Sequence, residues 1–154
     1  MQKKIEIYTD GSSLGNPGRG GYGVVVIANG KVIHEIGGYE KDTTNNRMEL
    51  KAVIEALEYA KKKHAKDEVI IHADSAYVLG GVTTWIHNWE KNGWKTANKK
   101  PVLNQDLWQE LIALVRSFGG HLSWNKVKGH SDVEHNNRAD EIATQCSATQ
   151  KDLS

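Results

Sequence analysis

The feature that most restricts the fold of this chain is a change in hydrophobic period near Asp42. Before it, apolar and polar residues alternate, as around Ile5 and Ile7, which is typical of a strand with one buried face. After it, apolar residues recur at helical spacing, which predicts an amphipathic helix over 46–63: Met48, Ala52, Ala56, Leu57 and Ala60. A chain with both periods combines a sheet with helices that pack on it.

The first forty residues predict an antiparallel meander. Strands are expected over 3–9, 22–28 and 31–39, and the glycine-rich stretch over 11–21 is expected to form a loop. Asn29-Gly30 between the second and third strands is the strongest short signal for a tight hairpin. These three strands are therefore expected to be neighbours in one sheet.

The rest of the chain predicts alternating helices and strands. The apolar run over 69–73 is typical of a strand covered on both faces. A short helix is expected after Ser75, another over 84–91, a stronger one after Pro101, a strand over 121–127 and a last helix over 135–148. The fold class is therefore α/β, with a five-stranded mixed sheet that begins as an antiparallel meander and continues with parallel strands. We expect one domain over 1–148 and a flexible tail over 149–154.

Composition restricts the compartment and the chemistry. The chain has 154 residues and no apolar run of the length that a signal peptide or a membrane span needs, so we expect a cytoplasmic monomer without a membrane partner. A single cysteine, Cys146, excludes an internal disulfide. The net charge is +1, but residues 83–101 hold four lysines and one acid, a local +3. One basic segment on a near-neutral chain suggests a local contact with an anionic partner.

Two aspartates stand where strands end. Asp10 and Asp74 each follow a predicted strand, and ligands of such sheets bind beyond the carboxyl ends of parallel strands. Aspartate also favours turns, so each has a plain structural explanation. Glu49 is explained equally well by a capping box with Asn46, and Asp140 by the positive end of its helix. These patterns alone do not select the functional acids, although Mg²⁺ would favour such oxygen ligands.

Longer motifs surround these acids. In chain order they are Tyr-Thr-Asp-Gly-Ser (8–12), Gly-Asn-Pro-Gly (15–18), Thr-Asn-Asn-Arg-Met-Glu-Leu (44–50), Ala-Asp-Ser (73–75), Trp-Ile-His-Asn-Trp (85–89), Gly-Trp-Lys-Thr (93–96), Val-Lys-Gly-His (127–130) and Arg-Ala-Asp-Glu (138–141). The set resembles the bacterial type 1 ribonucleases H from about residue 3 to residue 148. The resemblance implies the ribonuclease H-like fold, with helices on both faces of a five-stranded sheet.

The resemblance also implies a metal site and a mobile histidine. It makes the metal ligands Asp10, Glu49, Asp74 and Asp140, which would hold two Mg²⁺ ions, or Mn²⁺ in their place, at the scissile phosphate. His130 matches a histidine that moves protons or assists product release, and its reference pKa near neutrality suits that role. The plain alternative for His130 is a loop residue with one structural hydrogen bond.

Substrate contacts follow from the same resemblance. Asn16 and Asn45 would read RNA 2′-hydroxyls, which distinguish RNA from DNA. Thr44 and Asn104 would hold a DNA phosphate, although helix capping explains both residues equally. The basic segment would contact the DNA strand, with one of its tryptophans structural, through Trp85, Trp89, Lys91, Lys95, Lys99 and Lys100.

The function implied is that of an endoribonuclease. It would hydrolyse the RNA strand of RNA–DNA hybrids and leave 5′-phosphate and 3′-hydroxyl ends. One alternative is a DNA-acting nuclease of the same superfold, because fold alone does not fix the substrate. The other is a catalytically silent hybrid-binding module, which is expected to have lost at least one of the four carboxylates.

Overall fold

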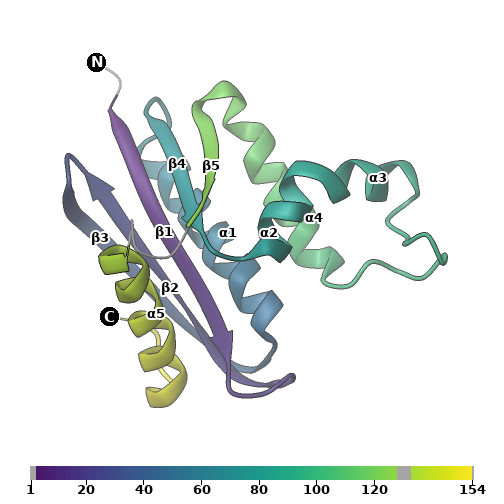
Figure 1. The fold of residues 1–154 in the computed structure, drawn as a ribbon, viewed down its shortest axis with the longest axis horizontal. Helices are drawn as coiled ribbons and strands as arrows, with labels where there is room; N and C mark the ends of the chain where they lie inside the picture. The colour runs from purple at the N-terminus through teal and green to yellow at the C-terminus, as the bar shows by residue number, and fades with distance from the viewer. Residues whose placement is uncertain (1–2, 128–132, 154) are drawn as a thin grey trace.

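A computed structural model describes residues 3–127 and 133–153 of the chain. The elements follow one another as Figure 1 shows. They are β1 (Lys4–Ser13), β2 (Gly18–Ala28), β3 (Lys31–Thr43), α1 (Asn45–Lys63), β4 (Glu68–Ala73), α2 (Ala76–Gly80), the π-helical turn η1 (Gly81–Trp85), α3 (Ile86–Lys91), α4 (Gln105–Ser117), the 3₁₀ turn η2 (Gly119–His121), β5 (Leu122–Lys126) and α5 (Val133–Thr149). Among these residues, no helix has both the length and the apolar character to cross a membrane.

The sheet has five strands in the order β3-β2-β1-β4-β5. β1 pairs antiparallel with β2, and β2 pairs antiparallel with β3. β4 pairs parallel with both β1 and β5. The predicted mixed sheet, with a meander at one edge and parallel strands at the other, is therefore confirmed.

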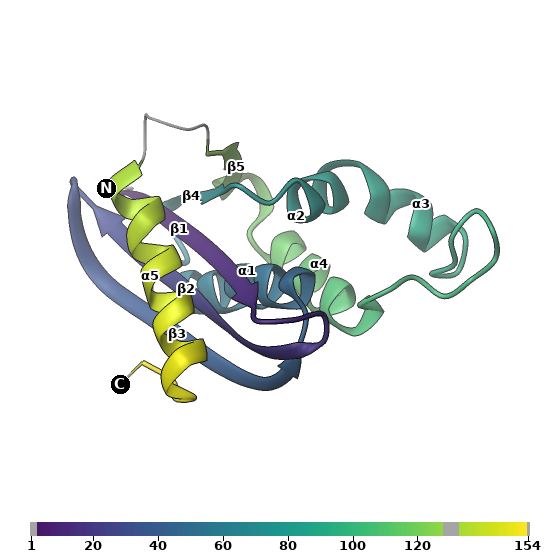
Figure 2. The same ribbon diagram turned by 60° about the horizontal axis from the view of Figure 1, so that its bottom comes forward.

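Helices cover both faces of this sheet, as predicted. α1 packs on β1 and β2 and supports α4 in turn, and the larger apolar core lies between them, with Trp108 fully buried in it. α5 packs on the opposite face against β1, β2 and β3, over a smaller apolar cluster. Figure 2 shows α5 on one side of the strands and α1 with α4 on the other. The strands in the middle of the sheet therefore bury side chains on both faces.

The predicted glycine-rich loop is wrong over much of its length. β1 continues to Ser13 and β2 begins at Gly18, so only 14–17 connect the two strands. Gly18, Gly20 and Gly21 of this stretch belong to β2, which α5 crosses closely. A Cβ built on Gly21 would lie 2.3 Å from the backbone oxygen of Ala143. Glycine here permits the close approach of a helix rather than a turn.

The other boundaries agree with the predictions within a few residues, with two exceptions. The helix predicted over 84–91 forms as η1 followed by α3, and a π-helical turn of this kind often occurs near functional sites. Residues predicted to form a flexible tail make specific contacts: the Asp152 carboxylate accepts from the Tyr39 amide at 2.8 Å, and the Leu153 amide donates to the Gly37 carbonyl at 3.0 Å. The mobility of this tail remains a prediction.

Candidate active site

Adjacent parallel strands bring two aspartates together. Thr9 of β1 lies opposite Ala73 of β4 in the sheet, so the residues that follow them, Asp10 and Asp74, are also neighbours. Asp10 is half-buried and Asp74 is exposed. This is the arrangement predicted from their positions at the strand ends.

Glu49 reaches the same point from α1. The helix crosses β1 so closely at Gly11 that a Cβ there would lie 2.3 Å from the Met48 carbonyl carbon. The Gly11 amide donates to Glu49 Oε1 at 3.0 Å, which fixes the carboxylate beside Asp10. The capping-box explanation of Glu49 is wrong, because the helix is capped by Thr44 and Glu49 lies beyond its first turn.

The three carboxylates form a group that fits a divalent cation. Ligand oxygens of Asp10, Glu49 and Asp74 all lie within 4.8 Å of one another. The pKa of Asp10 is raised to about 7, mainly by burial and also by the nearby Asp140 and Asp74, whereas Glu49 opposes the rise. Burial, followed by the charge of Asp10, raises the pKa of Glu49 to about 9. The raised pKa values mean that the charged forms of these carboxylates are unfavourable without a counter-ion. An all-oxygen group of this kind fits a hard metal ion such as Mg²⁺.

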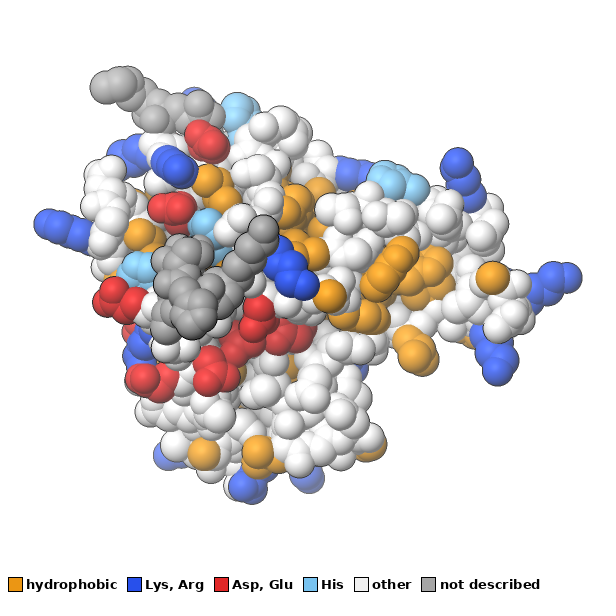
Figure 3. Space-filling view, viewed as in Figure 1, with side chains coloured by type: hydrophobic (Ala, Val, Ile, Leu, Met, Phe, Trp, Pro, Cys, Tyr) orange, Lys and Arg blue, Asp and Glu red, His pale blue; other side chains and the backbone are white. Residues whose placement is uncertain are grey.

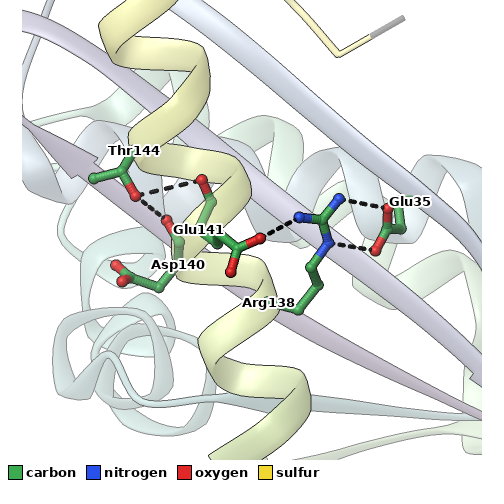
Figure 4. Close-up of polar contacts among 5 residues, drawn as sticks. All are labelled: Glu35, Arg138, Asp140, Glu141 and Thr144. Carbon is green, nitrogen blue, oxygen red and sulfur yellow. Dashed lines mark hydrogen bonds and ion pairs between the residues drawn. The ribbon is translucent and has the colours of Figure 1, made fainter.

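Asp140 approaches the group from α5. Its side chain is exposed and lies near enough to Asp10 to raise the pKa of that carboxyl. The helix-end explanation of Asp140 is wrong, because α5 begins at Val133 and Asp140 lies two turns further on, where the helix dipole has little effect. Figure 4 shows Asp140 on α5, with the Thr144 hydroxyl donating to the Asp140 backbone carbonyl. The four predicted acids therefore come from four parts of the fold: β1, α1, the end of β4 and α5.

A polar hollow lies next to the acid group. The Asn16 side chain accepts from the Asn45 amide at 3.0 Å, and the Asn45 side chain accepts from the Ser13 amide at 2.7 Å, so the β1–β2 connection is tied to the start of α1. Thr44 accepts from the Arg47 amide at 3.2 Å and caps α1, as its structural explanation predicted. The hollow is lined by Asn16, Thr44, Asn45, Asn46, Leu103 and Asn104.

Asn104 enters this hollow from the start of α4. Its backbone is left-handed and its side chain does not cap the helix. The Asn104 amide nitrogen instead donates to the Tyr77 hydroxyl at 3.0 Å, and its oxygen accepts from Arg47 at 3.3 Å. Arg47 is itself held by both carboxylate oxygens of Asp106, at 3.0 and 2.8 Å. Sequence reasoning missed these supporting residues, although Arg47 lies within the motif over 44–50.

The basic segment protrudes beyond α2, as Figures 1 and 2 show. Trp89 is half-buried and packs against Trp85, Trp94 and Trp108 at centroid distances of 6.0, 6.2 and 5.3 Å. Trp85 is 39% exposed and borders a hollow with Asn88, Asn92 and Lys95. Trp89 is thus structural, as expected of one of the pair. All four lysines of the segment are exposed: Lys91, Lys95, Lys99 and Lys100.

Charge is segregated on this face of the molecule. Figure 3 shows acidic side chains gathered at its centre, and basic side chains around the protruding segment.

His130 lies outside the described residues, so its predicted place beside the site stays a prediction.

The sheet order defines an α/β protein with a ribonuclease H-like fold, and the acid group at its strand ends is placed to bind metal. LC9-RNase H1, a type 1 ribonuclease H, superimposes with a TM-score of 0.82 at 33% identity, over 99% of this chain and 75% of that one. LC11-RNase H1 in complex with an RNA/DNA hybrid gives a TM-score of 0.73 at 29% identity, over 95% and 98% of the two chains.

Sequence comparison gives the family. The profile of the RNase H family matches residues 2–148. The Ribonuclease H of Escherichia coli O139:H28 is 55% identical over 144 residues, which cover 93% of this chain and 88% of that protein. The Ribonuclease H of Thermosynechococcus vestitus is 51% identical over 144 residues, or 94% and 89% of the two chains. The chain belongs to the RNase H family.

Proposed function

We propose that the chain is an endoribonuclease that hydrolyses the RNA strand of RNA–DNA hybrids. The observation that carries this proposal is the group formed by Asp10, Glu49 and Asp74, whose ligand oxygens lie within 4.8 Å of one another at the sheet edge. Membership of the RNase H family, and the hybrid bound to LC11-RNase H1, support the choice of substrate. Water adds to the phosphorus and the bond to the 3′ oxygen breaks, which leaves 5′-phosphate and 3′-hydroxyl ends.

Asp10, Glu49, Asp74 and Asp140 would hold the metal. Two Mg²⁺ ions, for which Mn²⁺ would substitute, supply activation of the attacking water and stabilisation of the leaving oxygen. The Gly11 amide, which donates to Glu49 at 3.0 Å, holds one of these carboxylates in place beside Asp10. The raised pKa values of Asp10 and Glu49 mean that protons would leave these two groups when a cation binds.

The substrate would lie across the acid group with its two strands on different surfaces. Asn16 and Asn45, exposed beside the acids, would read RNA 2′-hydroxyls. Thr44 and Asn104, which line the same hollow, would hold a phosphate of the DNA strand. Further along that strand, the half-exposed Trp85 and the lysines of the protruding segment would contact the backbone, with Trp89 supporting Trp85 from below.

Several finer points belong to the same proposal. His130 would move a proton at the leaving oxygen or assist product release, as expected from its motif. The working form would be a cytoplasmic monomer that uses Mg²⁺. Residues 1–148 would act as one catalytic domain.

The experiment uses a hybrid duplex labelled on the RNA strand, with a DNA duplex of the same sequence as the matched substrate. In Mg²⁺ the chain should cut only the hybrid, EDTA should abolish cleavage, and Asp10→Asn should lower the rate by several orders of magnitude. Cleavage of the DNA duplex would favour the DNA-acting alternative. Binding of the hybrid without cleavage at any Mg²⁺ or Mn²⁺ concentration would favour the silent module. Unchanged hydrolysis by Asp10→Asn would refute the proposed site.

A further inference from the structure

The surface under α5 is smooth where the helix crosses it. Built Cβ atoms on Gly21 and Gly23 of β2 would lie 2.3 and 2.2 Å from the backbone oxygens of Ala143 and Ala139. The absence of side chains lets the helix backbone lie directly on the strand. At these two positions it also removes side chains that would otherwise oppose rotation of the helix about its own axis, and the resistance that remains comes from the smaller apolar cluster around Ile142.

A two-point ion pair joins α5 to the edge strand on one side. Arg138 Nε donates to Glu35 Oε2 at 2.7 Å, and a terminal nitrogen of Arg138 donates to Glu35 Oε1 at 2.9 Å. Glu35 lies on β3 and is half-buried, and the pair holds its pKa below the usual range. The other terminal nitrogen donates to Glu141 Oε1 at 2.6 Å within the helix. A fork held at two points fixes orientation as well as distance.

The Asp140 side chain points outward from the opposite side of α5. Figure 4 shows Arg138 directed toward Glu35 and Asp140 directed away from it, on opposite sides of α5. Asp140 lies near Asp10 of β1, close enough to raise the pKa of the Asp10 carboxyl. Side-chain atoms lie about 5 Å from a helix axis, so a roll of about 10° would move the Asp140 carboxylate by about 1 Å. A shift of this size is large for a metal ligand, because ligand distances are held within about 0.2 Å.

We propose that the Glu35–Arg138 pair positions Asp140, by fixing the rotation of α5 over its glycine floor. This inference rests on the proposed role of Asp140 as a metal ligand. Arg138 contacts Glu35 and Glu141 rather than the four acids of the site, so it is a positioning residue. The same contact opposes the repulsion that would turn Asp140 away from Asp10 when no cation lies between them.

The test measures Mn²⁺ binding by calorimetry, with MnCl₂ as the only ligand. Glu35→Gln keeps the shape of the side chain but offers the Arg138 fork one acceptor atom instead of two. We expect it to weaken Mn²⁺ binding by about tenfold, the usual scale for a group that orients a ligand. Glu141→Gln is the matched control, because it removes the other carboxylate that Arg138 contacts, which is exposed and on the same helix. Its Mn²⁺ affinity should stay within about twofold of the parent, since an exposed pair contributes little.

A double-mutant cycle separates positioning from general stability. If the pair acts through Asp140, Glu35→Gln should cause no further loss of Mn²⁺ affinity once Asp140→Asn is present. An equal loss in both backgrounds, or parent-like affinity in Glu35→Gln, would overturn the inference. Thermal melts of the same samples check that each variant is folded. Hybrid cleavage by the parent tests the proposed function independently, so the two ideas fail on different results.

Discussion

Replacing Asp10 by Asn should stabilise the metal-free protein. The substitution removes an acid whose pKa is raised to about 7 by burial and by its acidic neighbours. Because the folded pKa lies above the unfolded value of 3.8, the folded protein retains this proton between about pH 4 and pH 7. The contribution of Asp10 to stability is therefore least unfavourable at low pH, and becomes increasingly unfavourable as pH rises through that window.

The size of the effect follows from the shift. One pKa unit corresponds to about 1.4 kcal/mol, so a rise from 3.8 to about 7 costs the metal-free fold about 4 kcal/mol above pH 7. At pH 5 the same reasoning gives a smaller cost of about 2 kcal/mol, because the folded group still holds its proton and pH 5 is only a little above the pKa of the unfolded group. Imperfect hydrogen bonding of the new amide offsets part of the gain, by about 1–2 kcal/mol. Asp10→Asn should therefore raise the free energy of unfolding by about 2–3 kcal/mol at pH 8, and by little at pH 5.

The assay is urea unfolding followed by circular dichroism, in EDTA, at pH 5 and pH 8. Asp42→Asn, an exposed aspartate of β3, is the control and should change stability by less than about 0.5 kcal/mol. Mg²⁺ should stabilise the parent more than Asp10→Asn, since the bound ion neutralises the Asp10 carboxylate, which the variant lacks. The reasoning is refuted if Asp10→Asn is less stable than the parent at pH 8, or if its advantage is the same at both pH values.

Three further predictions concern the surfaces around the site. Trp89→Ala should lower the free energy of unfolding by about 3 kcal/mol, measured by denaturation, because Trp89 packs against three tryptophans. Trp85→Ala should cost less stability and should mainly weaken hybrid binding, measured in a binding assay. Gly23→Ala should destabilise by several kcal/mol in a melt, since its Cβ would lie 2.2 Å from the Ala139 oxygen. Replacing the four exposed lysines of the basic segment with Gln should reduce the salt slope of hybrid binding by about 3.6 without changing sequence preference. An unchanged slope would mean that these lysines face only solvent: Lys91, Lys95, Lys99 and Lys100.

Much of the fold was predictable because hydrophobic period reports burial directly. The alternation around Ile5 and Ile7 and the helical spacing from Met48 both correspond to side chains that are fully buried. The glycine-rich stretch was misassigned for a physical reason. A glycine that admits a helix, such as Gly21, has the same local signal as a glycine in a turn, and only the position of α5 distinguishes them.

The site was predictable in unequal parts. Strand-end positions were enough to nominate Asp10 and Asp74, since register in a parallel pair follows from strand order. Glu49 and Asp140 carried plausible local explanations that only the observed helix boundaries remove. Contacts such as that of Asn104 with Tyr77 join segments 27 residues apart, so no local pattern contains them. Long-range polar contacts of this kind require the fold before they can be read.

The separation of charge on the molecule has a consequence for how substrate is bound. The acid group around Asp10 is negative, and a phosphate placed there without a cation would meet carboxylates directly. The exposed lysines of the protruding segment attract the nucleic-acid backbone whether or not metal is present. Hybrid affinity therefore divides into a part set by salt, at the protrusion, and a part set by divalent ions, at the acids. Since the same ions also relieve the repulsion that raises the pKa values of Asp10 and Glu49, the energy that destabilises the metal-free fold is what makes the site bind its cations.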